Sequence, residues 1–219
     1  KTVATGQAQF GLPGLGATVK AISEGINVTA VAAYLQISPG GIVSFADKPV
    51  REPKDLEGKS LSVAPFGATA MMLPAFAKKN GVDMSKVKTI TYNFGAMVPS
   101  FLTGKVDSTI GYYFGEFLAA RTKSNNRKVI FLRFADHGID AYANGIIVNN
   151  DFMKSNPKAV RAFVQTSLRG LRHTIAHIDE AVTETAKHTE TAAATLRQQL
   201  ALALELIDTC AEWLKTLTG

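Results

Sequence analysis

Short apolar runs bounded by glycine, proline or polar residues alternate along the chain with segments whose apolar positions recur every three or four residues. The first pattern is typical of buried strands and the second of amphipathic helices. Strands are expected near residue 12 and over 28–35, 41–45, 60–64, 87–92, 107–111, 129–134 and 141–149. Helices are expected over 15–23, up to 79, over 97–102 and 116–123, and from 157 and about 189 onward. This alternation predicts an α/β protein.

Two stretches about a hundred residues apart are near-copies of each other. Residues 5–11 and residues 103–111 each contain a Gly that can end a helix, a small polar or acidic turn, a short apolar strand and a final Gly. The repetition predicts two lobes built to one plan. We expect the loops 12–16 and 111–116 to face each other across a cleft, because ligands of open α/β sheets bind beyond the strand ends. The alternative is that two such joints look alike because turn chemistry is limited.

A polar connector with two prolines, residues 47–53, is expected to be extended and stiff. It predicts a division into a first lobe over 1–57, a second lobe over 58–138, and a return to the first lobe with C-terminal helices over 139–219. Within the last part, an apolar stripe from Leu196 to Leu217 predicts a helix that packs on the first lobe or on a partner.

Two prolines are expected at helix starts. Pro157 follows Asn156, which we expect to cap the helix that begins there. Pro74 would disturb a helix beginning at Ala70, but it suits the first position of one beginning near Leu73. The first turn of that helix is therefore expected to be kinked or late.

The composition, 219 residues of which 46% are hydrophobic, allows one good core or two small ones. No apolar run is long enough to span a membrane, and an export signal is expected to be absent or already removed. The lone Cys210 excludes a disulfide scaffold. The net charge of +6 resides in clusters that lack interleaved aromatics, so we expect no nucleic-acid partner.

Several motifs, together with the repeat, resemble one known family: residues 55–59, 136–139, 156–163 and 177–181. In this order and spacing, they are similar to substrate-binding proteins of ABC importers, in particular the thiamine-pyrimidine-precursor binding family. Neighbouring branches bind alkanesulfonates, taurine and nitrate. The resemblance spans nearly all of residues 1–187. Members usually have a further strand and helix upstream of the region matching Lys1 and continue further at the C-terminus.

This resemblance implies a type II periplasmic-binding fold, in which two α/β lobes joined by two crossing strands close on a small ligand. It implies a protein of the periplasm or of the extracellular face of the membrane that delivers its ligand to the transmembrane subunits of an ABC permease. It implies no cofactor and no catalysis.

Candidate ligand-binding residues lie at the expected strand ends and hinge. They are Leu12, Pro13, Gly14, Gln36, Ser38, Phe66, Gly67, Ala68, Thr69, Asn93 with its neighbour Phe94, Tyr112, Glu116 and His137. The run 66–69 offers backbone N–H groups, a hydroxyl and a helix N-terminus, which suit an anion, although an ordinary helix cap has the same pattern. His137 is expected at the hinge or rim, or as a loop residue without a ligand role.

Tyr112 and Glu116 are four residues apart, on one face where strand turns into helix. In the pyrimidine-precursor family, a Tyr and a Glu at this spacing contact the heterocycle. An aromatic face can stack on the ring while a carboxylate accepts from its N–H groups. The alternative is a surface Glu beside a packed Tyr, and Tyr113 is expected in the core.

Other classes of function have less support. His173 and His177 have the i, i+4 spacing of a metal pair, but no third ligand is evident, so no metal is expected. Pyrimidine-precursor synthases share the fold but carry a cysteine-rich motif that this sequence lacks. Effector domains of LysR-type regulators also share it, but they follow a winged helix. An alkanesulfonate-, taurine- or nitrate-type binding protein remains the alternative within the same fold.

Overall fold

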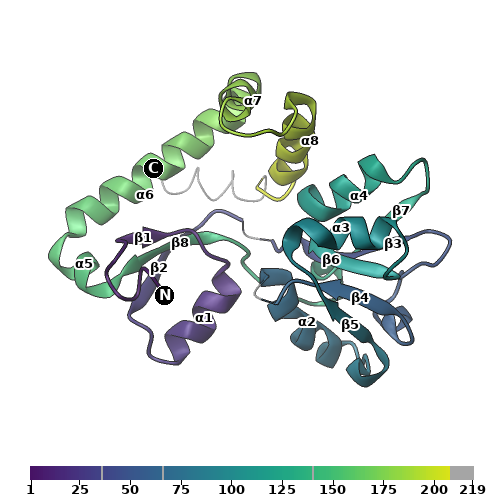
Figure 1. Cartoon of the computed structure of the whole chain (residues 1–219). Coiled ribbons are helices and arrows are strands. Elements are labelled where there is room, and N and C mark those ends of the chain that lie inside the picture. The colour runs from purple at the N-terminus through teal and green to yellow at the C-terminus, as the bar shows by residue number, and fades with distance from the viewer. Residues whose placement is uncertain (36, 66, 140, 208–219) are drawn as a thin grey trace. The chain divides into compact units, whose positions relative to one another are not determined.

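The chain is organised as two compact units. The computed structural model describes residues 1–35, 37–65, 67–139 and 141–207. Unit 1 comprises Lys1–Gln36 and Tyr142–Gly219, and unit 2 comprises Ile37–Ala141 (Figure 1). Residues 37–57, which the proline connector assigned to the first lobe, therefore belong to unit 2. The reason is strand pairing, since the strand in this segment pairs on both sides with strands of unit 2.

Unit 2 contains a mixed five-stranded sheet in the order β5-β4-β6-β3-β7. Its strands are β3 (Gly40–Phe45), β4 (Ser60–Val63), β5 (Lys88–Thr91), β6 (Ser108–Tyr112) and β7 (Val129–Arg133). β4 runs parallel to β5 and β6, whereas β3 runs antiparallel to β6 and β7. The helices are α2 (Ala68–Lys79), α3 (Phe94–Leu102) and α4 (Leu118–Lys123), with 3₁₀ turns at Pro53–Leu56, Met84–Lys86 and Ala135–His137.

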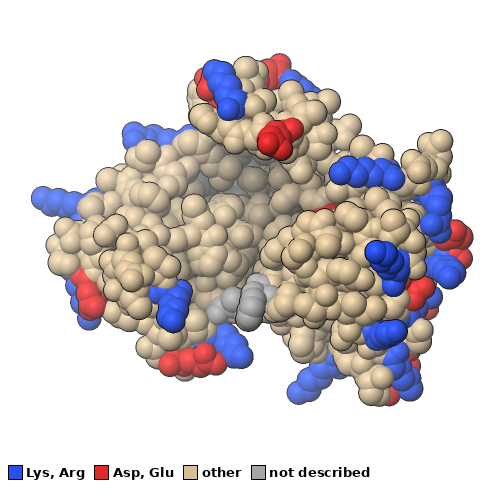
Figure 2. Space-filling view, viewed as in Figure 1, with Lys and Arg blue, Asp and Glu red and all other residues tan. Residues whose placement is uncertain are grey.

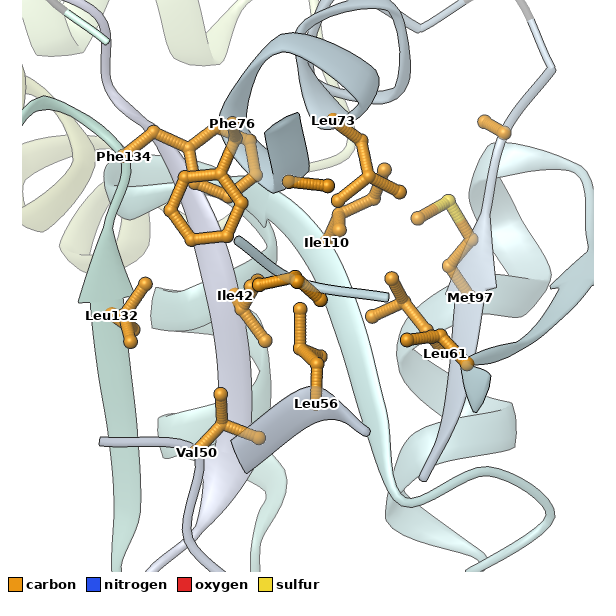
Figure 3. Packing of buried hydrophobic residues seen from close by; sticks show 14 residues of the cluster. Ile42, Val50, Leu56, Leu61, Leu73, Phe76, Met97, Ile110, Leu132 and Phe134 are labelled. Atoms are coloured by element: carbon orange, nitrogen blue, oxygen red, sulfur yellow. The ribbon is translucent and has the colours of Figure 1, made fainter. Parts of the chain in front are cut away.

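Side chains of β3 alternate between two hydrophobic clusters, as the two-residue period of a strand requires. Ile42 belongs to a cluster with Phe76 of α2, where the Phe76 and Phe134 rings stack with centroids 4.3 Å apart (Figure 3). Val43 belongs to a second cluster with Phe101 of α3. Every residue of β3 is buried. The sheet is thus covered on both faces, which explains the continuous apolar run in the sequence.

Unit 1 is built on a three-stranded antiparallel sheet in the order β1-β8-β2. Its strands are β1 (Phe10–Gly11), β2 (Val28–Ala33) and β8 (Gly145–Asn149). Its helices are α1 (Leu15–Ser23), α5 (Asn150–Ser155), α6 (Pro157–Ala176), α7 (Ile178–Ala186) and α8 (Ala193–Leu204). Among the described residues, no helix is long and apolar enough to cross a membrane.

The two near-copies in the sequence have matching local backbone. Gly6 and Gly104 both adopt φ 74°, a left-handed conformation that favours glycine. Thr5 and Thr103, which precede them, each donate a side-chain hydrogen bond to backbone carbonyls three and four residues earlier. The copies lead into β1 and β6, which belong to different sheets. The prediction of two lobes is therefore confirmed, but they are not built to one plan, since one sheet is three-stranded and antiparallel and the other five-stranded and mixed.

Some helix starts and ends differ from the sequence expectation. α2 begins at Ala68 and contains Pro74 in its interior, so its start is not late. Pro157 begins α6 as predicted, but Asn156 makes no side-chain capping bond. Asn149 caps α5 instead, where its Oδ1 accepts the N–H groups of Asp151 and Phe152. The end of the expected C-terminal stripe and Cys210 lie outside the described residues.

Candidate functional site

One edge of the unit 2 sheet gathers most of the candidate residues. β4, β5 and β6 run in the same direction, so their carboxyl ends meet at this edge, and antiparallel β3 begins there. Ligands of α/β sheets bind beyond the carboxyl ends of parallel strands. The candidates at this edge are Ser38, Gly67, Ala68, Thr69, Asn93, Tyr112 and Glu116. Gln36 and Phe66 lie outside the described residues.

The start of α2 provides backbone N–H groups. Gly67 precedes the helix in an extended conformation, φ −70° and ψ 140°, and has no side chain with which to cap it. The first amides of any helix lack intrahelical acceptors and carry a partial positive charge. The Thr69 side chain is buried and lies against Gly40, at the start of β3. This helix start can therefore receive an anionic group.

Ser38 holds the turn that leads into β3. Ser38 is only 1% exposed. Its hydroxyl accepts the Gly40 N–H at 3.2 Å and donates to the Met72 sulfur at 3.6 Å. These contacts give the Ser38 hydroxyl a structural role at this edge, which the sequence did not predict.

Asn93 and Phe94 begin α3 beside the start of α2. The Asn93 Oδ1 accepts the Ala96 N–H at 2.9 Å, which caps α3. The Phe94 residue is 63% exposed, and its ring edge would lie 3.3 Å from a Cβ atom at Gly67. An exposed aromatic ring next to a helix N-terminus offers an apolar wall for a bound ring. The sequence analysis named Phe94 among the candidates at a strand end, but it expected the helix to begin at residue 97 and did not place Phe94 in its first turn.

Glu116 folds back onto the end of β6. A single π-helical turn, Tyr113–Phe117, connects β6 to α4. Across this turn, the Glu116 Oε2 accepts the Tyr112 N–H at 2.7 Å. A Cβ atom at Gly111 would come within 2.5 Å of the Glu116 Cγ and Oε2, so the carboxylate depends on glycine at this position. Single π-helical turns are frequent at functional sites.

The two tyrosines on either side of this turn have different surroundings. The Tyr112 ring contacts Phe114 with centroids 5.5 Å apart. The Tyr113 ring stacks on Phe117 at 5.2 Å and packs against the second hydrophobic cluster. Tyr113 was predicted to be a core residue; it packs against the core but is itself only half-buried.

His137 contacts the C-terminal end of α2, not its N-terminal end. Its carbonyl accepts the Asn80 side-chain N–H at 3.1 Å, and its ring meets Phe76 edge-on. Lys79 donates to the neighbouring Gly138 carbonyl at 2.8 Å. In the part of the chain that the structure describes, His137 thus helps to hold the last turn of α2, in agreement with the alternative of a loop residue.

The unit 1 candidates lie where β1 leads into α1. The Pro13 carbonyl accepts the Gly145 N–H at 3.2 Å, and Gly14 forms a bridge with Asn144. Leu12 is 63% exposed. Leu12 and Pro13 line a largely apolar cavity of about 470 Å³ within unit 1, together with residues of the N-terminal segment, α1 and β8.

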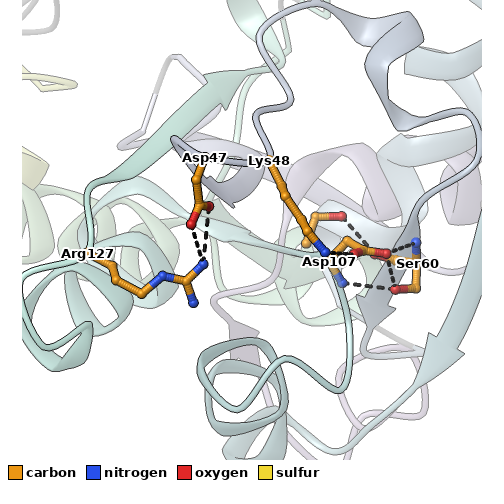
Figure 4. Close-up of polar contacts among 6 residues, drawn as sticks. Asp47, Lys48, Ser60, Asp107 and Arg127 are labelled. Atoms are coloured by element: carbon orange, nitrogen blue, oxygen red, sulfur yellow. Dashed lines mark hydrogen bonds and ion pairs between the residues drawn. The ribbon is translucent and has the colours of Figure 1, made fainter.

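Charged side chains do not gather into one basic strip on the face that Figure 2 shows. Blue and red side chains are scattered over it, with uncharged surface between them. Paired charges are present as well, such as Arg127 with Asp47 at 2.8 Å (Figure 4).

The fold is that of the periplasmic binding proteins. The crystal structure of the aliphatic sulphonate binding protein SsuA from Escherichia coli aligns with a TM-score of 0.78 and 14% identity, and the alignment covers 96% of this chain and 77% of that one. The α/β class and the periplasmic-binding fold predicted from the sequence are confirmed. Residues 1–181 match the family described as NMT1/THI5 like, and the chain belongs to this family.

Two relatives differ in what they are named for, one for ligand binding and the other for synthesis. The riboflavin-binding protein RibY of Chloroflexus aurantiacus is 29% identical over 159 residues, which are 72% of this chain and 44% of RibY. The 4-amino-5-hydroxymethyl-2-methylpyrimidine phosphate synthase of Legionella pneumophila is 22% identical over 183 residues, which are 82% of this chain and 56% of the synthase. The chain spans about half the length of these relatives.

Proposed function

We propose that this chain is the ligand-binding part of an extracytoplasmic solute-binding protein that captures a small molecule and delivers it to an ABC permease. The family, the fold shared with a periplasmic binding protein and the relative named as a riboflavin-binding protein support this proposal. It entails binding without chemical turnover.

We propose further that the ligand is a planar nitrogen heterocycle, with a pyrimidine precursor of thiamine as the first candidate. The observation that carries this proposal is the Glu116 carboxylate, held at the end of β6 by the Tyr112 N–H. A carboxylate has about four acceptor sites, so one backbone N–H does not exhaust it. It can accept from an amino group and a ring N–H while an aromatic face stacks on the ring. Tyr112 and the exposed Phe94 supply aromatic faces at this edge of the sheet.

A second candidate ligand is a sulfonate-type anion. The start of α2, with Gly67 in place of a capping side chain, supports it, because such a helix start favours anionic oxygens. The related fold of an aliphatic sulphonate binding protein adds to this support. The two candidates differ in the role of Glu116, since a carboxylate repels an anion and attracts N–H donors.

The test is a thermal-shift and calorimetry panel of the pyrimidine precursor, thiamine, riboflavin, an alkanesulfonate, taurine and nitrate. A ligand present at a hundredfold excess over its Kd adds about 2.7 kcal/mol to the free energy of unfolding, which is readily measured. We expect the heterocycle to bind and Glu116→Gln to abolish its binding. Glu184→Gln, which changes an exposed carboxylate of α7, is the matched control and should leave binding unchanged.

Three results would overturn parts of this proposal. Binding of the alkanesulfonate that survives Glu116→Gln would favour the anion. Failure of every ligand to bind would contradict the assignment of ligand binding to this part of the protein. Conversion of the bound pyrimidine, followed by NMR, would favour an enzyme, as the name of the Legionella relative suggests.

A further inference from the structure

The junction between α6 and α7 brings two histidines and a glutamate together. His177 lies between α6, which ends at Ala176, and α7, which begins at Ile178, and has φ −133° and ψ 58°. Its N–H donates to the His173 carbonyl at 2.9 Å, and its own carbonyl accepts the Ala181 N–H at 3.0 Å. The helix therefore breaks at His177, while the hydrogen bonds on both sides of the break are kept.

Three potential metal ligands converge at this break. One ligand atom from each of His173, His177 and Glu180 lies within 4.8 Å of the others. The His173 Nε2 is 3.3 Å from the Glu180 Oε2, and the two imidazole rings stack with centroids 4.2 Å apart. The sequence showed the histidine pair but no third ligand, and the structure supplies Glu180.

The hydrogen bonding of His177 prepares it as a ligand. Its Nδ1 lies 3.0 Å from the His173 carbonyl oxygen. A carbonyl oxygen can only accept, so this contact favours the proton on Nδ1 and leaves the lone pair on Nε2. Metal-binding histidines commonly donate their second ring N–H to a backbone carbonyl in this way, which fixes the orientation of the ring.

The surroundings also favour a cation. His173 lies in the last turn of α6, where the carbonyl end of the helix carries a partial negative charge. The neighbouring carboxylate of Asp179 pairs with Arg197, which leaves Glu180 to face the histidines. All three side chains are exposed, so a metal ion can reach them and small rotations can bring them to coordination distance.

We propose that His173, His177 and Glu180 bind a zinc-type divalent transition-metal ion at the α6–α7 junction. Two imidazole nitrogens and one carboxylate oxygen form a donor set that Zn²⁺ accepts, with water at the fourth position. Ligands about 2.0–2.1 Å from one tetrahedral ion are roughly 3.3–3.4 Å apart, which matches the separation between His173 and Glu180. The ion would link the last turn of α6 to the first turn of α7 through its ligands. The site lies in unit 1 and is independent of the heterocycle-binding proposal for unit 2.

The test is calorimetric titration of ZnCl₂ into the whole chain after its affinity tag has been removed and bound metal has been stripped with a chelator. We expect one zinc ion per chain, and at least a tenfold weaker affinity in His173→Ala and in Glu180→Gln, because each variant loses one of three ligands. His188→Ala is the matched control, since it removes an exposed histidine outside the cluster. Circular dichroism checks that each variant keeps its helices.

NMR of the histidine rings identifies the atoms involved. Zinc should shift the Nε2 resonances of His173 and His177 and leave those of His188 and His137 in place. The absence of binding, or binding that the His173 and Glu180 variants leave unchanged, would overturn the proposal. Mg²⁺ binding as tightly as Zn²⁺ would also contradict it, because Mg²⁺ prefers oxygen ligands.

Discussion

The Glu116 carboxylate accepts the Tyr112 backbone N–H at 2.7 Å across a single π-helical turn. This hydrogen bond joins the last residue of β6 to a side chain at the start of the following helical segment. It holds the carboxylate over the backbone of Gly111, where a Cβ atom would collide with it. The position of the Glu116 carboxylate, the proposed ligand acceptor, thus depends on the absence of a side chain at Gly111.

The first prediction concerns Gly111→Ala. The added methyl group would lie within 2.5 Å of the Glu116 Cγ and Oε2, so it must displace the carboxylate from the Tyr112 N–H. We expect at least a tenfold loss of heterocycle affinity by calorimetry, and a loss of about 1–3 kcal/mol in the free energy of unfolding. Gly115→Ala is the control, because its Cβ would meet only the Tyr112 Cβ at an ordinary 3.6 Å. Equal affinity in the two variants would contradict the role of Glu116.

The second prediction concerns Gly41, near the start of β3, which is an inner strand of the unit 2 sheet. A Cβ atom at this position would collide with the Leu132 carbonyl oxygen and lie 2.5 Å from the Phe131 ring. We expect Gly41→Ala to lower the free energy of unfolding by about 2–3 kcal/mol, measured by urea denaturation. Gly170→Ala is the contrast, because that helical position has open space around it. It should raise the free energy of unfolding by about 0.5–1 kcal/mol through helix propensity.

The third prediction concerns the contact between Asp107 and Ser60. The Asp107 Oδ2 accepts the Ser60 hydroxyl at 2.6 Å and the Ser60 N–H at 2.9 Å (Figure 4). We expect Asp107→Asn to lower the free energy of unfolding by on the order of 1 kcal/mol at neutral pH, a value reduced because solvent screens the partly exposed carboxylate. Asp47→Asn, which affects an exposed ion pair with Arg127, should have little effect. A similar loss in both variants would contradict this ranking.

The same contact predicts a pH dependence. The hydrogen bonds from the Ser60 hydroxyl and then the Ser60 N–H hold the pKa of Asp107 below its usual value. A carboxylate with a lowered pKa stabilises the folded state fully above the unfolded pKa, about 3.9 for Asp, and this stabilisation is lost as the pH falls through the folded pKa. The difference in stability between the wild type and Asp107→Asn should therefore shrink below pH about 4. Urea denaturation at several pH values measures it, and a difference that grows on acidification would contradict the assignment.

The fourth prediction concerns Pro74 in the interior of α2. Proline has no N–H to donate to the carbonyl four residues earlier, and its ring crowds that carbonyl. We expect Pro74→Ala, at this exposed position, to raise the free energy of unfolding by on the order of 1–3 kcal/mol. Pro157→Ala is the control, since the first position of α6 needs no N–H and little change is expected there. Destabilisation by Pro74→Ala would contradict this prediction and would indicate that packing of the proline ring stabilises the fold by more than the missing hydrogen bond costs.

Local signals in the sequence predicted much of the secondary structure. The helix expected over residues 15–23 is α1 with the same bounds, and the left-handed Gly25 follows it. The glycine-turn-strand repeat predicted the matching left-handed Gly6 and Gly104. These features depend on neighbouring residues, through backbone sterics and the spacing of apolar positions.

Contacts between distant residues were not predictable in the same way. The connector at residues 47–53 looks like a boundary, yet β3 before it pairs with β6 and β7, far along the chain, and draws residues 37–57 into unit 2. The π-helical turn at Tyr113–Phe117 was expected to be ordinary loop and helix. The third potential metal ligand, Glu180, is different: residues 173, 177 and 180 have the i, i+4, i+7 spacing of one helix face, so this local pattern was present in the sequence and was missed.

The sequence by itself thus determined the α/β class, most of the helices and strands, and the family, because these follow from periodic burial, turn chemistry and ordered motifs. Only the tertiary structure decided which strands pair, that the Ser38 hydroxyl meets the Met72 sulfur, and that the His137 carbonyl accepts from Asn80 at the end of α2. The physical reason is that side-chain direction and burial depend on packing among residues remote in sequence, which no local pattern specifies.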